Sequence, residues 1–323
     1  MNTLVIKHHG AINGVTGSCH ELSLGNDYGI LVDCGLFQGA ETSGKGADAN
    51  LLKIEFPIEH IKALVVTHVH IDHVGRIPYL LAAGFTGPIL CSQPSAHLLP
   101  LVLEDAVKLG FTRDPQLVSK FLGLLRKRML GMPYKHWFSL LDEAGRRVRV
   151  RLQPAGHILG SAYVEFDVRA AASEQDRRIV FSGDLGAPHA PLLPAPASPY
   201  RCDTLVIEST YGNRKHPDRR ARKAKLQALL ERALADQGVV LIPAFSICRT
   251  QEILYELEAI IAAQLAKGAN GSGTANSATN GGSTNRSSTN GSSTNGSSTN
   301  KSSKNNSAVD WTSLAIIVDS PLA

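Results

Sequence analysis

Thr67-His68-Val69-His70-Ile71-Asp72-His73 is the stretch on which the interpretation of this chain depends. It follows the apolar run Ala63-Leu64-Val65-Val66, which predicts a buried strand. Side chains two residues apart point the same way in extended chain, and a turn can add the next one. Imidazole nitrogen and carboxylate oxygen both bind zinc, so the stretch predicts a metal site; chance histidines in a polar turn are the weaker alternative. The candidate ligands are His68, His70, Asp72 and His73.

Two later loops offer ligands in the same setting. His157 stands in the glycine-flanked stretch 156–160, where a tight loop brings the backbone close to a neighbour. Asp184 follows the predicted buried strand 179–181 and also lies between glycines. On its own, His157 is better explained as a structural histidine. Together the residues can hold two metal ions: His68, His70 and His157 one, Asp72 and His73 a second, with Asp184 bridging both.

Two more acids come at the ends of predicted strands. Asp33 follows the strand 30–32 and stands two residues before Gly35, so it is either a turn residue or a partner that orients a histidine ligand from behind. Glu208 follows the strand 205–207 and opens the stretch Glu208-Ser209-Thr210-Tyr211-Gly212.

Composition narrows the class of protein. With 323 residues the chain can form two domains, and 43% hydrophobic residues with a mean hydropathy of −0.04 are typical of a soluble protein. No apolar run reaches the roughly 20 residues of a membrane span, and the N-terminus lacks a signal-peptide pattern. The five cysteines form no CxxC motif, which excludes Cys-based zinc fingers and predicts reduced thiols in the cytoplasm.

Strands and helices alternate along the chain in an α/β pattern. Beyond the strands named above, we expect strands at 3–9, 20–34, 88–91, 147–152, 238–243 and 314–318. We expect helices from residue 75, and at 94–109, 114–130, 217–236 and 246–267.

A basic run and a polar insert stand out after residue 208. Residues 214–225 hold seven Lys or Arg and one acid, which is either a solvated helix face or a track for phosphates. Residues 268–307 are dominated by Gly, Ser, Thr, Asn and Ala in a five-residue repeat, which predicts a disordered linker. The candidate contacts to phosphates are Arg214, Lys215, Arg219, Arg220 and Arg249.

These motifs resemble the metallo-β-lactamase superfamily, and their order is similar to that of its β-CASP branch, the nucleases that process RNA and DNA. The resemblance covers the chain except residues 268–307. It is carried by the metal-ligand stretches above and by segments 15–18, 33–39, 156–162, 208–212, 243–252 and 319–323. The relatives we expect are bacterial RNA-processing proteins similar to the nuclease subunit of the mRNA 3′-end cleavage complex.

The resemblance implies an αββα metallo-β-lactamase domain over 1–208 and the first, Rossmann-like part of a β-CASP domain over 209–323. It implies two zinc ions held by the ligands above, with Asp33 as the partner that orients a histidine ligand from behind. RNA is the expected partner, with single-stranded DNA as an alternative; no membrane is expected, and a homodimer stays open. Asp72 and Glu208 are the candidate catalytic residues, Glu208 pairing with a later histidine that protonates the leaving oxygen.

The chain departs from the family pattern in three ways. By this resemblance it stops before two later motifs, so we expect either a fragment of a longer protein or a reduced form whose second zinc lacks one histidine and whose leaving-group acid is missing. The insert 268–307 replaces a short loop, and Cys248 stands where relatives usually have glycine.

We therefore expect a zinc-dependent ribonuclease that acts through a metal-bound hydroxide, with activity reduced by the missing motifs. The alternatives are a small-substrate hydrolase of the same fold, such as a thioesterase or lactonase, and a non-catalytic nucleic-acid-binding remnant. The stretch 208–212 and the basic run argue against the small-substrate enzyme.

Overall fold

The computed structural model of the chain describes residues 4–38, 53–110, 112–171, 175–215, 219–271 and 309–319. These residues form two compact units, Met1–Lys215 and His216–Ala323. Each unit is described by itself.

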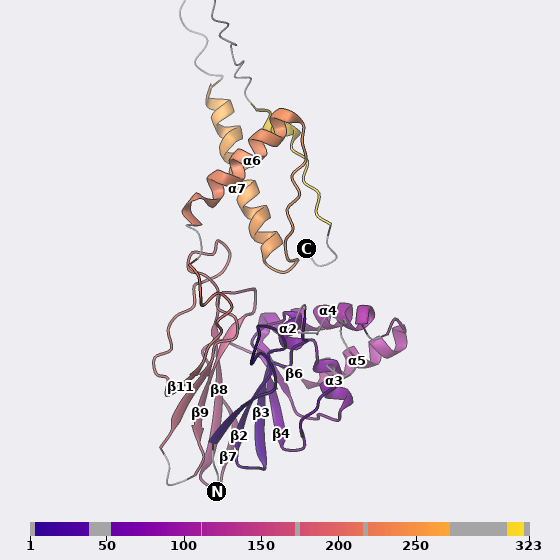
Figure 1. Cartoon of the computed structure of the whole chain (residues 1–323), viewed down its shortest axis with the longest axis vertical. Coiled ribbons are helices and arrows are strands. Elements are labelled where there is room, and N and C mark those ends of the chain that lie inside the picture. Colours follow the sequence, from indigo (N-terminus) through magenta and orange to yellow (C-terminus); the bar gives the residue numbers. More distant parts are fainter. Residues whose placement is uncertain are drawn as a thin grey trace, which may run out of the picture. The chain divides into compact units, whose positions relative to one another are not determined.

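A six-stranded sheet runs through the first half of the first unit (Figure 1). The first two pairs of neighbours are antiparallel and the other three are parallel, as the predicted alternation of strands and helices requires. In spatial order the strands are β1 (Leu4–His8), β2 (His20–Leu24), β3 (Tyr28–Val32), β4 (Ile61–Val65), β5 (Ile89–Ser92) and β6 (Met129–Met132).

A five-stranded sheet follows in the chain. All its neighbours are antiparallel except the pair β10 and β11. In spatial order the strands are β11 (Thr204–Val206), β10 (Arg177–Phe181), β9 (Ala162–Arg169), β8 (Arg146–Pro154) and β7 (Phe138–Glu143).

The core of this unit lies between the two sheets. Leu22 and Ile30 of one sheet and Phe166 and Phe181 of the other are at most 1% exposed and belong to one apolar cluster. Strand β8 shows why the sheets pack this way, because its apolar residues alternate with arginines and point inward. Burial of each such large side chain contributes about 1.5–3 kcal/mol.

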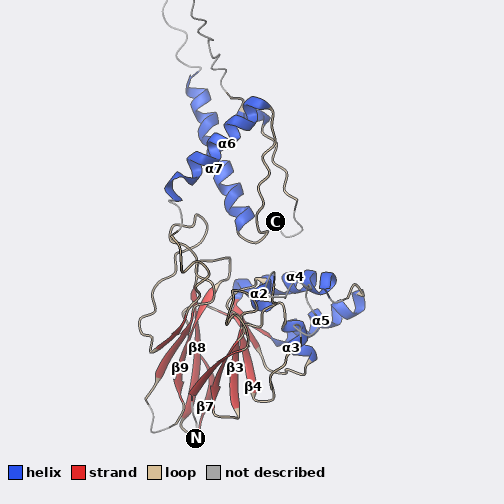
Figure 2. Ribbon diagram, viewed as in Figure 1, coloured by secondary structure: helices blue, strands red, loops and turns tan. Residues whose placement is uncertain are grey.

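Among the described residues of this unit, four helices lie beside the six-stranded sheet (Figure 2). Helix α4 packs on β5, β6 and α5, and α5 begins where Asp114 accepts a hydrogen bond from the Gln116 N–H. The predicted α/β class, with two packed sheets and helices beside one of them, is confirmed. The helices are α2 (Ile71–Val74), α3 (Ile77–Ala82), α4 (Gln93–Gly110) and α5 (Pro115–Arg128).

Helix α5 is shorter than predicted. Residues 129–132 form β6, which pairs in parallel with β5, whereas the sequence pattern extended the helix to residue 130. The edge of β5 offers Met129 a tertiary partner, and such pairing overrides a weak local helix preference.

The second unit is helical among its described residues. Leu230, Leu257, Ile260 and Trp311 form a small buried cluster. Helix α7 continues to Gly271, four residues into the predicted linker, while 272–307 lie outside the described residues. The elements are η2 (Arg219–Ala221), α6 (Arg222–Asp236), α7 (Arg249–Gly271) and η3 (Trp311–Ser313).

The strands predicted at 238–243 and 314–318 are wrong, since the structure assigns neither segment to a sheet. Val239 is 94% exposed and Ile317 is 90% exposed, so these apolar runs lie at the surface instead of in a core. A strand is stabilised by cross-strand pairing, which local sequence does not provide. Cys248 has a φ of 74°, in the region that favours glycine, the residue that its relatives were expected to have there. No helix in the described parts of the chain is long and apolar enough to cross a membrane.

Glu21 of β2 is a buried carboxylate whose charge is balanced by its neighbours. It is 1% exposed and accepts hydrogen bonds from Lys7 at 2.9 Å, from His9 and His60 at 2.8 Å each, and from Ser23. Burial alone would raise its pKa, but these hydrogen bonds outweigh burial and lower the pKa to about 2.

We expect Glu21→Gln to reduce the free energy of unfolding at pH 7 by about 1–3 kcal/mol. Because the folded-state pKa lies below the ordinary value, this stabilisation is present above about pH 4.5 and is lost as the pH falls towards 2. Urea unfolding of both proteins between pH 3 and pH 7 measures the difference. A difference that stays constant over this range would contradict the assignment.

Candidate metal centre

The first ligand loop is held by backbone hydrogen bonds that a four-residue helix could not supply itself. Strand β4 ends at Val65, and the chain turns through His68 and His70 into helix α2. The carbonyl groups of Ile71, Asp72 and His73 accept N–H groups from the neighbouring segment 18–36. These bonds satisfy the helix end and fix the backbone of both α2 ligands. The donors are Leu36, Ser18 and Cys34, in that order.

Four predicted ligands converge into one group. The Nδ1 atom of His70 lies 3.1 Å from Nε2 of His68 and 3.1 Å from Nε2 of His157. With one carboxylate oxygen of Asp184, these ligand atoms all lie within 4.8 Å of one another. Residues 68 and 157 are far apart in the sequence, so only the packing of the two sheets brings them together.

Asp184 also lies close to His73, and His73 in turn lies close to Asp72. Its Oδ1 lies 3.3 Å from Nε2 of His73, while its Oδ2 lies 3.4 Å from Nε2 of His157. Nε2 of His73 is 3.9 Å from Oδ2 of Asp72. One oxygen of Asp184 therefore lies near His157, and the other lies near His73. A carboxylate that bridges two metal ions needs this arrangement.

Asp33 lies behind His73 and holds it. Its Oδ2 accepts from Nδ1 of His73 at 2.7 Å and from the hydroxyl of Thr67 at 2.8 Å, and Oδ1 accepts from the Thr67 N–H at 2.8 Å. The hydroxyl of Ser18 adds a fourth hydrogen bond at 3.3 Å. The backbone of Asp33 has a φ of 61°, a conformation that Asp tolerates better than most residues. Its carboxylate turns the Nε2 atom of His73 towards the site.

Burial and neighbouring charges set the protonation of the ligands. Burial and the adjacent imidazoles keep the pKa of His68 well below its ordinary value, so this ring is neutral and can bind a cation. Burial would lower the pKa of His73 as well, but Asp33 and Asp184 raise it to about 10. Burial raises the pKa of Asp72. The two carboxylates around His73 therefore stabilise a positive charge at its Nε2 atom. Without a metal ion a proton supplies this charge, and a bound metal ion would take the place of the proton.

The donor set fits zinc. A tetrahedral zinc ion with Zn–N distances of about 2.0–2.1 Å separates its ligand nitrogens by about 3.3–3.4 Å. The nitrogen separations of 3.1 Å in the histidine group are close to that value. Contacts between crowded neutral imidazoles contribute little favourable free energy. Three imidazoles that share a carboxylate are therefore better explained as metal ligands than as a metal-free cluster.

Two loops next to strands of the five-stranded sheet supply His157 and Asp184 to the centre. The hydroxyl of Ser161 accepts the N–H groups of His157 and Ile158, which fixes the His157 loop. Gly183, with a φ of 50°, lies so close to Thr67 that a Cβ atom would be 2.7 Å from the Cβ of that residue. This close approach brings Asp184 next to the histidines.

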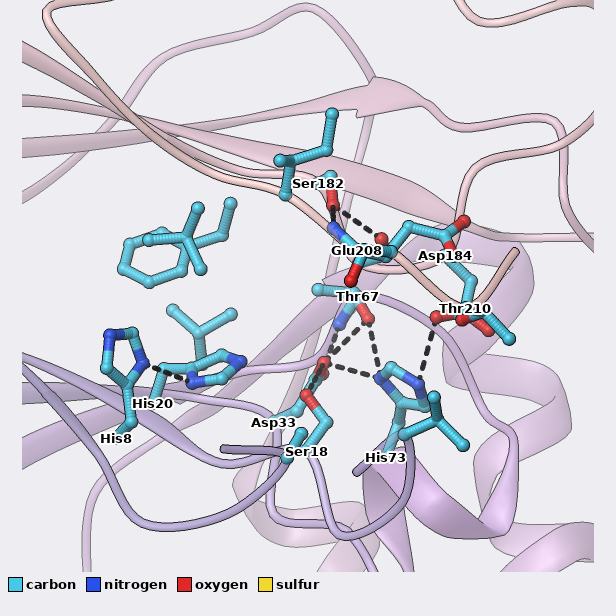
Figure 3. A pocket seen from close by; sticks show the side chains of 18 of the residues that line it. His8, Ser18, His20, Asp33, Thr67, His73, Ser182, Asp184, Glu208 and Thr210 are labelled. Atoms are coloured by element: carbon cyan, nitrogen blue, oxygen red, sulfur yellow. Dashed lines mark hydrogen bonds and ion pairs between the residues drawn. The ribbon is translucent and has the colours of Figure 1, made fainter. Parts of the chain in front are cut away.

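Glu208 lies in a cavity of about 280 Å³ that opens beside the centre (Figure 3). Its carboxylate accepts the Leu185 N–H at 2.9 Å, and its own N–H donates to the hydroxyl of Ser182 at 2.9 Å. His73 and Asp184 line the same cavity. Glu208 is thus held near the metal ligands and not among them.

The candidate RNA contacts are divided between the two units. Arg214 and Lys215 are exposed in the first unit, and Arg214 lies over the ring of Tyr211 at 5.9 Å. Arg249 forms an ion pair with Glu252 at 2.7 Å, which offsets its charge. Arg219, Arg220 and Arg249 belong to the second unit, so their role in RNA binding stays a prediction.

Sequence analysis missed the supporting hydroxyl groups. Thr67, Ser161 and Ser182 are at most 4% exposed and each holds a segment of the site. In the sequence, these residues could be recognised only by their position beside or near a predicted ligand. Serine and threonine are so common that this position does not by itself predict a supporting hydrogen bond.

Comparison with known proteins gives a consistent result. Residues 13–244 match the Metallo-beta-lactamase superfamily. The chain is 37% identical over 77% of its length to ribonuclease TTHA0252 of Thermus thermophilus and covers 53% of that protein. It is 30% identical over 78% of its length to the transcription termination factor FttA of Methanothermobacter thermautotrophicus, covering 39% of it. It is 27% identical over 77% of its length to cleavage and polyadenylation specificity factor subunit 3-II of Arabidopsis thaliana, covering 40% of it. The chain thus spans about half the length, or less, of these relatives.

We expect Asp33→Asn to weaken metal binding by a factor of roughly 10–100, because His73 loses the charged partner that orients it. Zinc affinity is measured by competition with a chromophoric chelator. Asp27→Asn is the matched control, since Asp27 is 64% exposed and pairs with Arg146 away from the site. Equal affinities in the two variants would show that Asp33 does not support the centre.

Proposed function

The chain belongs to the metallo-β-lactamase superfamily and its β-CASP branch, and on that basis we propose that it is a zinc-dependent ribonuclease. The observation that carries this proposal is the group of three histidines joined to His73 and Asp72 through Asp184. Relatives named as a ribonuclease and as a cleavage and polyadenylation factor support RNA as the substrate. The reaction would be hydrolysis of a phosphodiester bond.

Each ligand has a place in this proposal. His68, His70 and His157 would hold one zinc ion, Asp72 and His73 would hold a second, and Asp184 would bridge them. Zinc is favoured because it combines histidine and carboxylate ligands in both structural and catalytic sites. Bound zinc lowers the pKa of water from 15.7 to roughly 7 and so supplies a nucleophile at neutral pH.

The chain's own residues position the reacting groups. Asp33 and Thr67 hold His73 in one orientation, and the Ser161 hydroxyl holds the His157 loop. The Leu185 N–H keeps the carboxylate of Glu208 at the wall of the cavity, from where it can orient a proton donor to the leaving oxygen. Asp72, with its pKa raised by burial, is the second candidate for proton handling.

The compartment we propose is the cytoplasm. All five cysteines are free thiols, and Cys19, Cys34, Cys91 and Cys248 are buried in the structure. Free thiols are typical of proteins from reducing compartments.

RNA cleavage by the purified chain with added zinc tests the function. We expect cleavage of a labelled single-stranded RNA and a loss of roughly 10²-fold or more in His68→Ala, because this change removes a ligand at the centre of the group. His136→Ala is the control, since His136 is exposed and bonds only to the Tyr134 carbonyl. Equal rates in the two variants would reject the site.

The same assay separates the alternatives. A DNA strand of the same sequence shows whether the 2′-hydroxyl matters. Binding without turnover, falling steeply as salt rises, would instead identify a non-catalytic nucleic-acid binder.

Zinc titration of the full chain should show one tight site and one weaker site. The first group has three imidazoles, whereas His73 is the one imidazole that the described residues supply to the second. Isothermal titration calorimetry measures both, and His73→Ala should remove the weaker class alone. Two sites of equal affinity would contradict this division of ligands.

A further inference from the structure

A pair of histidines that the proposed mechanism does not use lines the cavity beside the metal centre. His8 ends β1 and His20 begins β2, and the two residues are direct partners in the antiparallel register. Their Nδ1 atoms are 2.9 Å apart and their rings meet edge to face at 4.9 Å. In Figure 3 they lie to the left of the cavity, with His73 and Asp184 to the right.

Apolar side chains line the cavity around this pair. The ring of Phe181 stacks against His20 at 6.0 Å. Ile12, Val15 and Ile207 line the same cavity and are 66%, 52% and 57% exposed. Exposed aliphatic residues that gather around a cavity with a few polar groups are typical of a ligand site.

The hydrogen bond between the rings determines what the pair can offer to a ligand. When both imidazoles are neutral, a contact between two Nδ1 atoms needs one donor and one acceptor. The ring that donates has a bare Nε2, which accepts, and the ring that accepts carries its proton on Nε2, which donates. Burial lowers the pKa of His20 to about 4, so this ring is neutral at pH 7. With both rings neutral, the pair offers one donor and one acceptor.

A metal ion is a poor fit to this end of the cavity. Zinc takes three or four protein ligands, whereas the pair supplies two. Within the described residues, the group of three or more metal-binding side chains is the one at His68. An aromatic ring with hydrogen-bonding edges fits better, because it can use both the apolar walls and the donor–acceptor pair.

We propose that this end of the cavity binds the base of the RNA nucleotide whose phosphate lies at the metal centre. His8 and His20 would hydrogen-bond the edge of the base, and the exposed side chains of Ile12, Val15 and Ile207 would cover its faces. The cavity of about 280 Å³ is just below the roughly 300–1,000 Å³ of small-molecule pockets, which suits a single nucleotide unit. This inference rests on the proposed function and makes the two histidines specificity residues that do not touch the reacting atoms.

A binding experiment with the full chain tests the base site directly. AMP, GMP, CMP, UMP and ribose 5-phosphate are titrated by calorimetry, and ribose 5-phosphate reports the phosphate and sugar alone. We expect at least one nucleotide to bind roughly tenfold tighter than ribose 5-phosphate, about the effect of one or two hydrogen bonds with some stacking. His8→Ala and His20→Ala should remove this difference, and His136→Ala should keep it. No preference for any nucleotide over ribose 5-phosphate, or a preference that survives in His20→Ala, would overturn the proposal.

A kinetic experiment separates base recognition from a role at the metal centre. We expect His20→Ala to raise KM for RNA roughly tenfold and to leave hydrolysis of bis(p-nitrophenyl) phosphate, which has no nucleobase, within about twofold. His20→Gln, which keeps a donor and an acceptor, should restore part of the loss. Equal losses on both substrates would overturn the inference. If the unmodified chain cleaves neither substrate, the proposed ribonuclease function fails, and nucleotide binding still decides whether the base site exists.

Discussion

The buried carboxylate of Asp33 is the group on which the arrangement of the site depends. A charge that is 1% exposed is stable only when its hydrogen bonds are satisfied, and Asp33 meets this requirement with partners from three segments. Ser18 comes from the loop before β2, Thr67 from the end of β4, and His73 from α2. One buried charge thus joins the loop, the strand end and the helix that surround the metal ligands. Moving the helix that carries His73 would leave the buried carboxylate without its imidazole partner, at a cost of about 3–5 kcal/mol.

The two sheets place the remaining ligands. The His157 loop precedes β9, and Asp184 follows β10, so both come from the five-stranded sheet, while the other ligands follow β4 of the six-stranded sheet. The packing of Phe166 and Phe181 against Leu22 and Ile30 sets the distance between the sheets. The apolar core therefore contributes to the 3.1 Å separation between His70 and His157 as directly as the local loops do.

Much of the first unit could be predicted from the sequence, because its elements carry strong local signals. Asp114 and Pro115 begin α5, and alternating arginines and valines identify β8. The wrong predictions at β6 and at segments 238–243 and 314–318 share one cause. Strand β6 formed where a neighbouring edge was free, and 238–243 and 314–318 stayed out of any sheet despite their apolar residues. A strand depends on its partner, and a partner far away in the chain leaves no mark on the local pattern.

The sequence alone was enough to predict the metal ligands, since three histidines and an aspartate within six residues are rare and their chemistry narrow. It also predicted Asp184 as a bridging residue, because this acid repeats the setting of the first cluster. The pairing of His8 with His20 and the cavity that they share with Glu208 came from the tertiary structure. The reason is physical: a ligand motif is a local property of the chain, whereas a cavity is the space left between segments whose packing depends on the whole fold.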